Sequence, residues 1–434
     1  MAGFDLRLRV ASAELLSLPW LVPLAEWDAT GVPLRDVPVG ATRHLVRFVE
    51  ADSALWALKE MPLSLAQREY RVLRELERRA LHAVRPAGVV VQPFDDSTIL
   101  VTRYLEGSWQ YRRLFLRLPS PMHRHRQRLF DAMAALLVDL HRNGIYWGDC
   151  SLANTLFKRD GQLLQAWMVD GETSEIHPSL TDGQRATDLE ILVENVSGGL
   201  LDVATRLDEP SETLDQIVDE ADSIRTRYED VWTVLHEEPS VRLGDHHLIE
   251  SRLRRLQDAG FAVEELRLVG GGAGKEELRL QLAVAERGFH TEDFRKRTGL
   301  EVGDGQAMIL LNDLRAHQTR RRQLGVAADD EAATADWLAQ VLHPGMARAH
   351  KALHGVGDPI QAYCDLLEVR WLLSERAGHD VGDEPALKAL RQRTVPAESA
   401  AEMGVADVPT QELPLVVVEE DEASTQPPQE TSDP

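Results

Sequence analysis

The sequence predicts an α+β fold with a small strand-rich part, a helical part, a further α+β domain and a disordered tail. Two patterns carry this prediction. Residues 45–104 contain short apolar segments separated by turn residues, which is typical of paired strands. Residues 126–143 instead place their apolar residues at helical spacing, and residues 201–241 are helical and strongly charged. With 434 residues, of which 43% are hydrophobic, the chain can bury about two or three cores.

The first predicted strands form a hairpin within residues 45–61. Lys59 lies on the second strand and shares its face with apolar residues, where an unpaired ammonium group is costly to desolvate. The helix predicted at residues 65–81 places Glu69 on its apolar stripe, where a carboxylate needs a cation. Each residue alone has an ordinary explanation, as a lysine that reaches water from a strand end or as a solvated helix acid. Together, the two charges predict an ion pair between strand and helix.

The most informative stretch is residues 140–172, LHRNGIYWGDCSLANTLFKRDGQLLQAWMVDGE. Asp149 and Asn154 lie five apart on a segment with too few apolar residues for a core strand. Two strands follow, and the Asp-Gly between them is a strong signal for a hairpin turn. The residue before the first strand of a hairpin and the residue after the second lie together at its open end, here called the mouth. Asn154 and Asp170 should therefore be neighbours. Their amide and carboxylate oxygens suit Mg²⁺ beside phosphate oxygens.

The spacing of Asp149 and Asn154, followed by a strand that ends in Asp170, resembles the catalytic loop and metal-binding aspartate of the protein-kinase-like superfamily. The segment WGDCSLAN resembles the His-Gly-Asp loop of bacterial small-molecule kinases such as aminoglycoside phosphotransferases. Most of the chain resembles the bacterial lipopolysaccharide (Kdo) kinase-like family, whose C-terminal half is domain of unknown function 4032. The resemblance implies a two-lobed protein-kinase-like fold, with a small β-rich N-lobe and a helical C-lobe.

The resemblance also implies a role for each of these residues. Asp149 would be the catalytic base, with Asn154 and Asp170 as the metal ligands. Lys59 would act in catalysis by holding the ATP phosphates, and Glu69 would hold Lys59. The matching segments are ALWALKE for the strand and REYRVLREL for the helix.

The chain departs from the kinase pattern at three places. Trp147 replaces the loop histidine, and Gly171 and Glu172 stand where protein kinases have Phe-Gly. No glycine-rich lid precedes the first hairpin, so Gly40 alone would cover the phosphates and is assigned to the cofactor site. In kinase-like folds an aspartate at about the position of Asp188 braces the backbone of the catalytic loop. A structural role or a helix N-cap is therefore expected for Asp188.

Changes in composition divide the chain. A kinase-like domain is predicted over residues 4–241 and an accessory α+β domain of unknown function over residues 242–393. Aromatic residues of the accessory domain, Trp371 among them, are expected in its helical core. Residues 394–434 contain ten Asp and Glu and no Lys or Arg, and they are predicted to be a disordered acidic tail. Removing this tail should therefore change stability by less than about 1 kcal/mol.

Charge and cysteine content narrow the class of protein. The net charge of -23 disfavours nonspecific nucleic-acid binding, which needs clustered Lys and Arg. The two cysteines, Cys150 and Cys364, form no metal or CxxC spacing and favour a reducing compartment. The sequence has no apolar run of about 18 residues to span a bilayer and no signal-peptide pattern at its start, so a cytoplasmic location is expected.

The resemblance therefore predicts an enzyme, an ATP-dependent phosphotransferase (kinase) that transfers the γ-phosphoryl group of MgATP to a hydroxyl of an unidentified acceptor. ATP and Mg²⁺ are the expected cofactors. The alternative is a pseudokinase, catalytically weak or inactive, which binds nucleotide and serves as a regulatory or scaffold protein. A protein partner would then bind through the C-terminal domain or the acidic tail. Neither a nucleic-acid partner nor a membrane span is expected.

Overall fold

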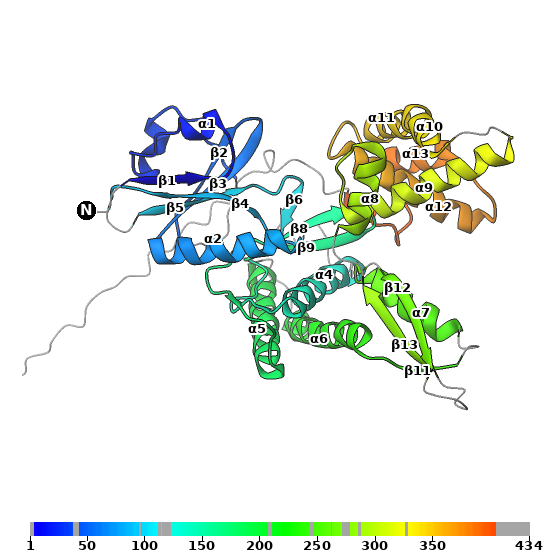
Figure 1. Cartoon of the computed structure of the whole chain (residues 1–434), viewed down its shortest axis with the longest axis horizontal. Helices are drawn as coiled ribbons and strands as arrows, with labels where there is room; N and C mark the ends of the chain where they lie inside the picture. Colours follow the sequence, from blue (N-terminus) through cyan, green and yellow to red (C-terminus); the bar gives the residue numbers. More distant parts are fainter. Residues whose placement is uncertain are drawn as a thin grey trace, which may run out of the picture.

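The computed structural model describes residues 4–37, 43–94, 97–111, 114, 123–206, 211–242, 246–261, 263–270, 278–284, 288–325 and 329–404. A strand-rich N-terminal part lies beside a first group of helices, and the rest of the chain adds a strand pair and a second group of helices (Figure 1). This order of parts is the one that the sequence predicts. Within the described residues, every helix is too short or too polar to cross a bilayer.

The N-terminal sheet is antiparallel, with the strand order β1-β4-β5-β3-β2. Its strands are β1 (Asp5–Leu8), β2 (Val46–Ala51), β3 (Ala54–Met61), β4 (Arg85–Val91) and β5 (Thr98–Arg103). One face is covered by α1 (Ala13–Leu16) and the 3-10 helix η1 (Leu24–Ala29), while α2 (Leu63–Arg78) packs on β4 and β5. Because side chains alternate along β3, Leu58 joins the core under α1 and η1, and Lys59 faces α2.

The first group of helices surrounds the segment that carries the predicted loop. Its long helices are α4 (His123–Arg142), α5 (Asp182–Arg206) and α6 (Ser211–His236). The hairpin consists of β8 (Thr155–Asp160) and β9 (Leu163–Met168), and β6 (Ser108–Gln110) extends it in the order β6-β8-β9. A short pair, β7 (Ile145–Tyr146) and β10 (Glu175–Ile176), closes the loop region. The hairpin lies near the centre of Figure 1, between the N-terminal sheet and the second group of helices.

Residues 242–393, predicted as one accessory domain, contribute to two different cores. A small sheet and a helix come first: β11 (Ser240–Val241), α7 (His246–Asp258), β12 (Val263–Gly270) and β13 (Leu278–Val284). Leu256 and Phe261 of this unit are buried in the same core as residues of α4, α5 and α6. Packing therefore joins the strand pair to the first group of helices, while most of the helices that follow build a second core.

The second group of helices has a core of its own, which includes Phe294 and Trp337. The group consists of α8 (Phe289–Thr298), α9 (Asp304–Gln323), α10 (Asp330–Trp337), the π-helical turn η2 (Leu338–Leu342), α11 (His343–Ala352), α12 (Pro359–Ala377), α13 (Asp383–Gln392) and α14 (Ala401–Gly404). The expectation that Trp371 lies in this core is wrong, since its side chain is 59% exposed. Apolar residues of α12 are not confined to its buried face but also occur on the exposed one. Their spacing therefore does not tell which of them are covered.

The packed part of the chain extends past residue 393, where the acidic tail was expected to begin. Ser399, Ala400 and Met403 are buried. Glu368 of α12 accepts hydrogen bonds from Ser399 Oγ at 2.8 Å and from the backbone N–H of Ala400 at 3.0 Å. The ordered part therefore ends later than the composition of this segment suggests. Composition gives no sign of the contact that anchors the segment, because that contact is made by a residue of α12. Residues 405–434 lie outside the described residues.

Candidate active site

The hairpin of β8 and β9 brings the predicted metal ligands to one place. Its register pairs Thr155 with Met168, and the backbone N–H of Val169 donates to the carbonyl oxygen of Asn154 at 3.1 Å. At the turn, Gly161 has a φ of 63°, a left-handed conformation that glycine adopts without strain. Asn154 and Asp170 therefore lie beside one another at the mouth of the hairpin, as the Asp-Gly turn predicts.

Asp149 is held by two amide side chains. Asn154 Nδ2 donates to its Oδ2 at 3.0 Å, and Asn195 Nδ2 of α5 lies 3.5 Å from its Oδ1. The Asn195 amide also donates to the carbonyl oxygen of Cys150 at 3.0 Å, so it fixes the loop as well as the carboxylate. Because the amide nitrogen of Asn154 points at Asp149, its amide oxygen is directed away from that carboxylate, which is the orientation a metal ligand needs.

Asp188 braces the loop from behind. Its fully buried carboxylate accepts from the backbone N–H groups of Trp147 at 2.7 Å and Gly148 at 2.8 Å, and from the Cys150 thiol at 3.2 Å. His141 Nε2 lies 3.1 Å from the same carboxylate. Several donors thus satisfy a buried acid, which is the usual condition for such a group. The structural role expected for Asp188 is present, whereas the N-cap alternative is wrong, since Asp188 lies inside α5.

Trp147, which replaces the loop histidine, keeps a hydrogen-bond donor at that position. Its indole is buried, and Nε1 donates to the carbonyl oxygen of Asp170 at 3.2 Å. Its own carbonyl oxygen accepts from Thr173 Oγ1 at 2.9 Å and from Ser174 Oγ at 3.0 Å. The substitution therefore links the loop to the segment after β9.

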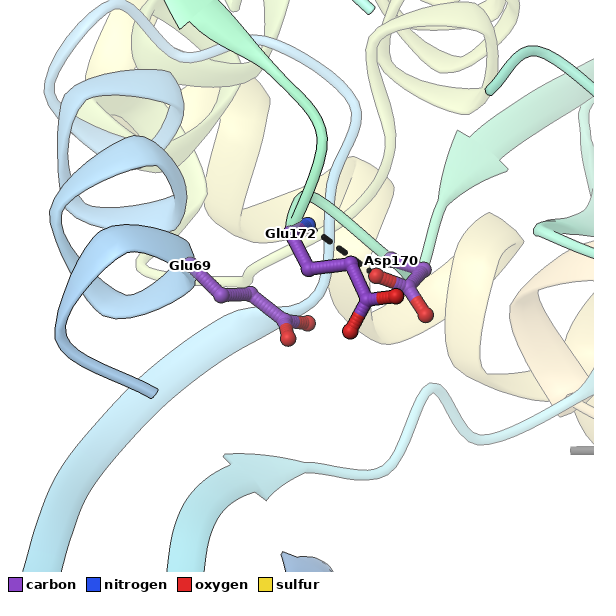
Figure 2. A group of neighbouring side chains, drawn as sticks. All are labelled: Glu69, Asp170 and Glu172. Atoms are coloured by element: carbon purple, nitrogen blue, oxygen red, sulfur yellow. Dashed lines mark hydrogen bonds between the residues drawn. The ribbon is translucent and has the colours of Figure 1, made fainter. Parts of the chain in front are cut away.

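Lys59 of β3 lies among three carboxylates at the mouth of the hairpin. Its Nζ is 2.6 Å from Asp170 Oδ2, 3.1 Å from Glu69 Oε2 and 3.7 Å from Glu172 Oε2. Figure 2 shows the three carboxylates, Glu69 from α2 and the others from the segment after β9. Their nearest oxygens all lie within 4.8 Å of one another. The ion pair that the strand and helix patterns predict between Lys59 and Glu69 is thus present.

One ammonium group that faces three carboxylates leaves a surplus of negative charge. Burial opposes the charge of Lys59, but the carboxylates of Glu69 and Asp170 outweigh it and raise the pKa of Lys59. Burial, together with the charge of Asp170, raises the pKa of Glu69 to about 8, against the opposing effect of Lys59. Both directions agree with one arrangement, in which Lys59 stays charged and Glu69, the most deeply buried of the three acids, takes up a proton more readily than an exposed glutamate.

Two residues of this cluster were not predicted as site residues. Glu172 was noted only as a departure from the kinase pattern, yet it reaches Lys59, and its backbone N–H donates to Asp170 Oδ1 at 3.1 Å. His44 Nε2 lies 2.9 Å from Glu172 Oε2. The Asp-Gly-Glu sequence could have indicated Glu172, as a second carboxylate two residues after the first. The sequence offers no comparable signal for His44.

A cavity of about 360 Å³ lies between the N-terminal sheet and the hairpin. All of the predicted site residues that the structure describes line it, namely Lys59, Glu69, Asp149, Asn154 and Asp170. Apolar side chains line it from both sides, among them Val46, Ala57 and Leu100 of the sheet and Leu156 and Val169 of the hairpin segment. Gly40, the remaining predicted residue, lies outside the described residues. The cavity thus combines apolar walls with one charged end.

Family comparisons match two separate parts of the chain. Residues 50–206 match the lipopolysaccharide kinase (Kdo/WaaP) family. Residues 230–395 match the domain of unknown function DUF4032. The resemblance that the loop motif indicates is therefore confirmed, and it is to a kinase family. The strand-rich N-terminal part and the helices that follow it are consistent with a kinase-like fold.

Among solved structures, one similar chain is described as WaaP in complex with acyl carrier protein. It shares 18% sequence identity, the match covers 47% of this chain and 90% of that chain, and the TM-score is 0.30. Comparison with curated proteins gives no match.

Proposed function

We propose that the chain is an ATP-dependent phosphotransferase that transfers the γ-phosphoryl group of MgATP to a hydroxyl of an acceptor molecule. One observation carries the proposal. A single cavity brings the ammonium group of Lys59 together with Asp149, Asn154 and Asp170, within residues that match a kinase family. In this reading residues 4–241 form the catalytic domain.

The residues around the cavity fit a nucleotide with a divalent cation. Carboxylate oxygens that converge within 4.8 Å are hard ligands, and the surplus of negative charge around Lys59 favours added positive charge. The cavity volume of about 360 Å³ is in the usual range for a small-molecule site, and its apolar walls suit a nucleobase. Asn154 and Asp170 would hold Mg²⁺, and Lys59 would bind the phosphates. The bound ion would supply charge neutralisation of the phosphate oxygens.

Asp149 is assigned to the acceptor. Two amides fix its carboxylate, so it can accept a hydrogen bond from a hydroxyl group without reorganising. Positioned acceptors of this kind contribute mainly to the transition state and little to nucleotide binding.

The test compares ATP turnover of the wild type and Asp149→Asn in the presence of Mg²⁺, with water or the protein itself as acceptor. Asp149→Asn should lower turnover by about a hundredfold or more and keep nucleotide affinity, because only the transition-state contact is lost. Lys59→Met is the matched control, and it should weaken nucleotide binding and turnover together.

Two outcomes would change the assignment. If Asp149→Asn turns over ATP at the wild-type rate, Asp149 is not the base. If the wild type binds nucleotide without turnover under all conditions tried, the pseudokinase alternative replaces the phosphotransferase.

A further inference from the structure

The turn of the β8–β9 hairpin, at the opposite end from Asn154 and Asp170, is buried against the second group of helices. Arg159 and Asp160 are each only 4% exposed. Charged residues beside a hairpin turn are normally solvated, so their burial has to be balanced by specific partners.

Arg159 is paired through both arms of its guanidinium group. Nη1 donates to Asp365 Oδ2 at 3.1 Å, and Nη2 donates to Asp365 Oδ1. Asp365 lies on α12 and is 3% exposed. The pair joins positions 206 residues apart in the sequence. Bidentate pairing fixes orientation as well as distance, which a packing contact between apolar side chains does not.

Asp160 accepts from the first turn of α9. The backbone N–H groups of Gly305 and Gln306 donate to its carboxylate at 2.9 Å and 2.8 Å. An added Cβ at Gly303 would lie 2.2 Å from Asp160 Oδ1, and one at Gly305 would lie 2.3 Å from the Asp160 carbonyl oxygen. The two glycines therefore permit a close approach of α9 to the hairpin.

The backbone of the turn is held as well. Gly161 N–H donates to Gln361 Oε1 at 2.9 Å, and Gln361 Nε2 donates back to the Gly161 carbonyl oxygen at 2.9 Å. Gln361 Nε2 also lies 2.9 Å from Asp365 Oδ1, which connects the backbone contact to the Arg159 pair. Side chain and backbone of the turn are thus tied to α12, and Asp160 is tied to α9.

This network fixes one end of a short, fully paired ladder. The register runs through six residue pairs, from Asp160 opposite Leu163 at the turn to Thr155 opposite Met168 at the mouth. Asn154 and Asp170 continue directly from that last pair. Because the ladder is short and continuous, the position of the turn determines the position of the mouth.

We propose that the helices of the DUF4032 region act as a positioning device for the active site, through Arg159, Asp160 and Gly161, so that Asn154 and Asp170 stay in the geometry that the metal-bound nucleotide requires. This inference rests on the proposed phosphotransfer. Arg159 and Asp160 are positioning residues, since they act on the site only through the hairpin.

The test uses the full chain with Asp365→Asn, which keeps the shape of the side chain and removes its charge. Amide hydrogen exchange at residues 154–156 and 168–170 reports on the mouth directly, and calorimetry of ATP with and without Mg²⁺ reports on the metal site. Asp365→Asn should speed exchange at the mouth and weaken the Mg²⁺-dependent part of ATP binding, each by about tenfold, because small displacements of positioned groups have effects of this size or larger. ATP binding without Mg²⁺ should stay unchanged.

Asp313→Asn is the matched control. Asp313 accepts from Trp337 Nε1 at 2.8 Å and from the Tyr363 hydroxyl at 3.0 Å, within the same group of helices and away from the hairpin. It should lower the melting temperature without affecting exchange at the mouth or the Mg²⁺ effect. If Asp365→Asn fails to fold, Gln361→Ala removes the contacts of Gln361 with Gly161 and leaves Arg159 paired with Asp365, so no buried charge loses its partner. The same shifts are then expected at smaller size.

Two results distinguish failure of this inference from failure of the proposed function. If Asp365→Asn shows the same exchange at the mouth and the same Mg²⁺ dependence of ATP binding as Asp313→Asn, the positioning role is overturned. A wild type without Mg²⁺-dependent ATP binding or turnover would overturn the phosphotransferase. In that case amide exchange at the mouth alone decides whether the helices hold the hairpin. Exchange at the wild-type rate in both Asp365→Asn and Gln361→Ala would show that they do not.

Discussion

The two ends of the β8–β9 hairpin each carry a basic side chain beside acids, and the two clusters differ in what satisfies those acids. At the mouth, one ammonium group, that of Lys59, faces three carboxylates beside a cavity. At the turn, Arg159 pairs with Asp365 in a site where both side chains are almost fully buried, and the neighbouring Asp160 is held by backbone N–H groups of α9. Carboxylates that share one ammonium group beside a cavity indicate a place for a ligand, whereas buried acids that each have their own donors indicate a joint between parts of the chain.

Replacing each basic residue by methionine tests this contrast most strongly. Arg159→Met leaves Asp365 buried without its cation, so the free energy of unfolding should fall by about 3–5 kcal/mol. Lys59→Met should change it by about 1 kcal/mol or less, because Glu69 already binds a proton readily and the other two acids are nearer to water. Urea unfolding of the two variants measures both values. Equal losses would show that the mouth cluster is as structural as the turn cluster.

The sequence predicts the mouth far better than the turn for a physical reason. Lys59, Glu69 and the neighbours Asn154 and Asp170 follow from strand alternation, helix spacing and a hairpin turn, all of which are local patterns. His44 and Glu172 are 128 residues apart, and Arg159 and Asp365 are 206 apart. Such contacts depend on how separate elements pack. The segment around Arg159 has the composition of a solvated turn, and the docking of α9 and α12 buries it.

Truncation of the chain extends the comparison to another buried acid, Glu368. Glu368 of α12 is satisfied by donors from Ser399, Ala400 and Ala401, so it should behave like the turn cluster. A chain that ends at Arg393 loses these donors and the buried side chain of Met403, and it should lose about 3 kcal/mol of stability. This value replaces the smaller change expected from composition.

Melting curves of two truncated chains check this prediction. A chain that ends at Gly404 keeps all of the contacts of Glu368 and serves as the control. If both chains melt together, the bonds to Glu368 contribute nothing measurable.

The surplus of negative charge at the mouth predicts that Mg²⁺ strengthens ATP binding, with a smaller free-energy change than the losses of stability above. ATP should bind at least about tenfold more tightly with Mg²⁺ than without it, a difference of about 1.4 kcal/mol, because Asn154 and Asp170 are too few ligands to hold the ion without phosphate oxygens. Asp170→Asn should remove most of this difference. Calorimetry provides the measurement, and Asp313→Asn, which lies outside the cavity, should retain it. Equal affinity with and without Mg²⁺ in the wild type would contradict the ligand assignment.

The smallest effect on stability is expected for His141, a titratable residue that lies behind the loop of Asp149 and not at either end of the hairpin. His141 lies between Asp188 at 3.1 Å and the Tyr228 hydroxyl at 2.7 Å, and burial lowers the pKa of His141 although Asp188 opposes this. In the unfolded chain a histidine has a pKa of about 6.5, so below that pH the unfolded state binds the proton more readily. Stability should therefore fall as the pH is lowered through about 6.5 toward 5. His141→Gln can still donate to Asp188 but does not titrate, and its stability should fall less over the same interval. Unfolding measured at both ends of the interval gives the difference, and an equal fall in wild type and variant would show that His141 does not control it.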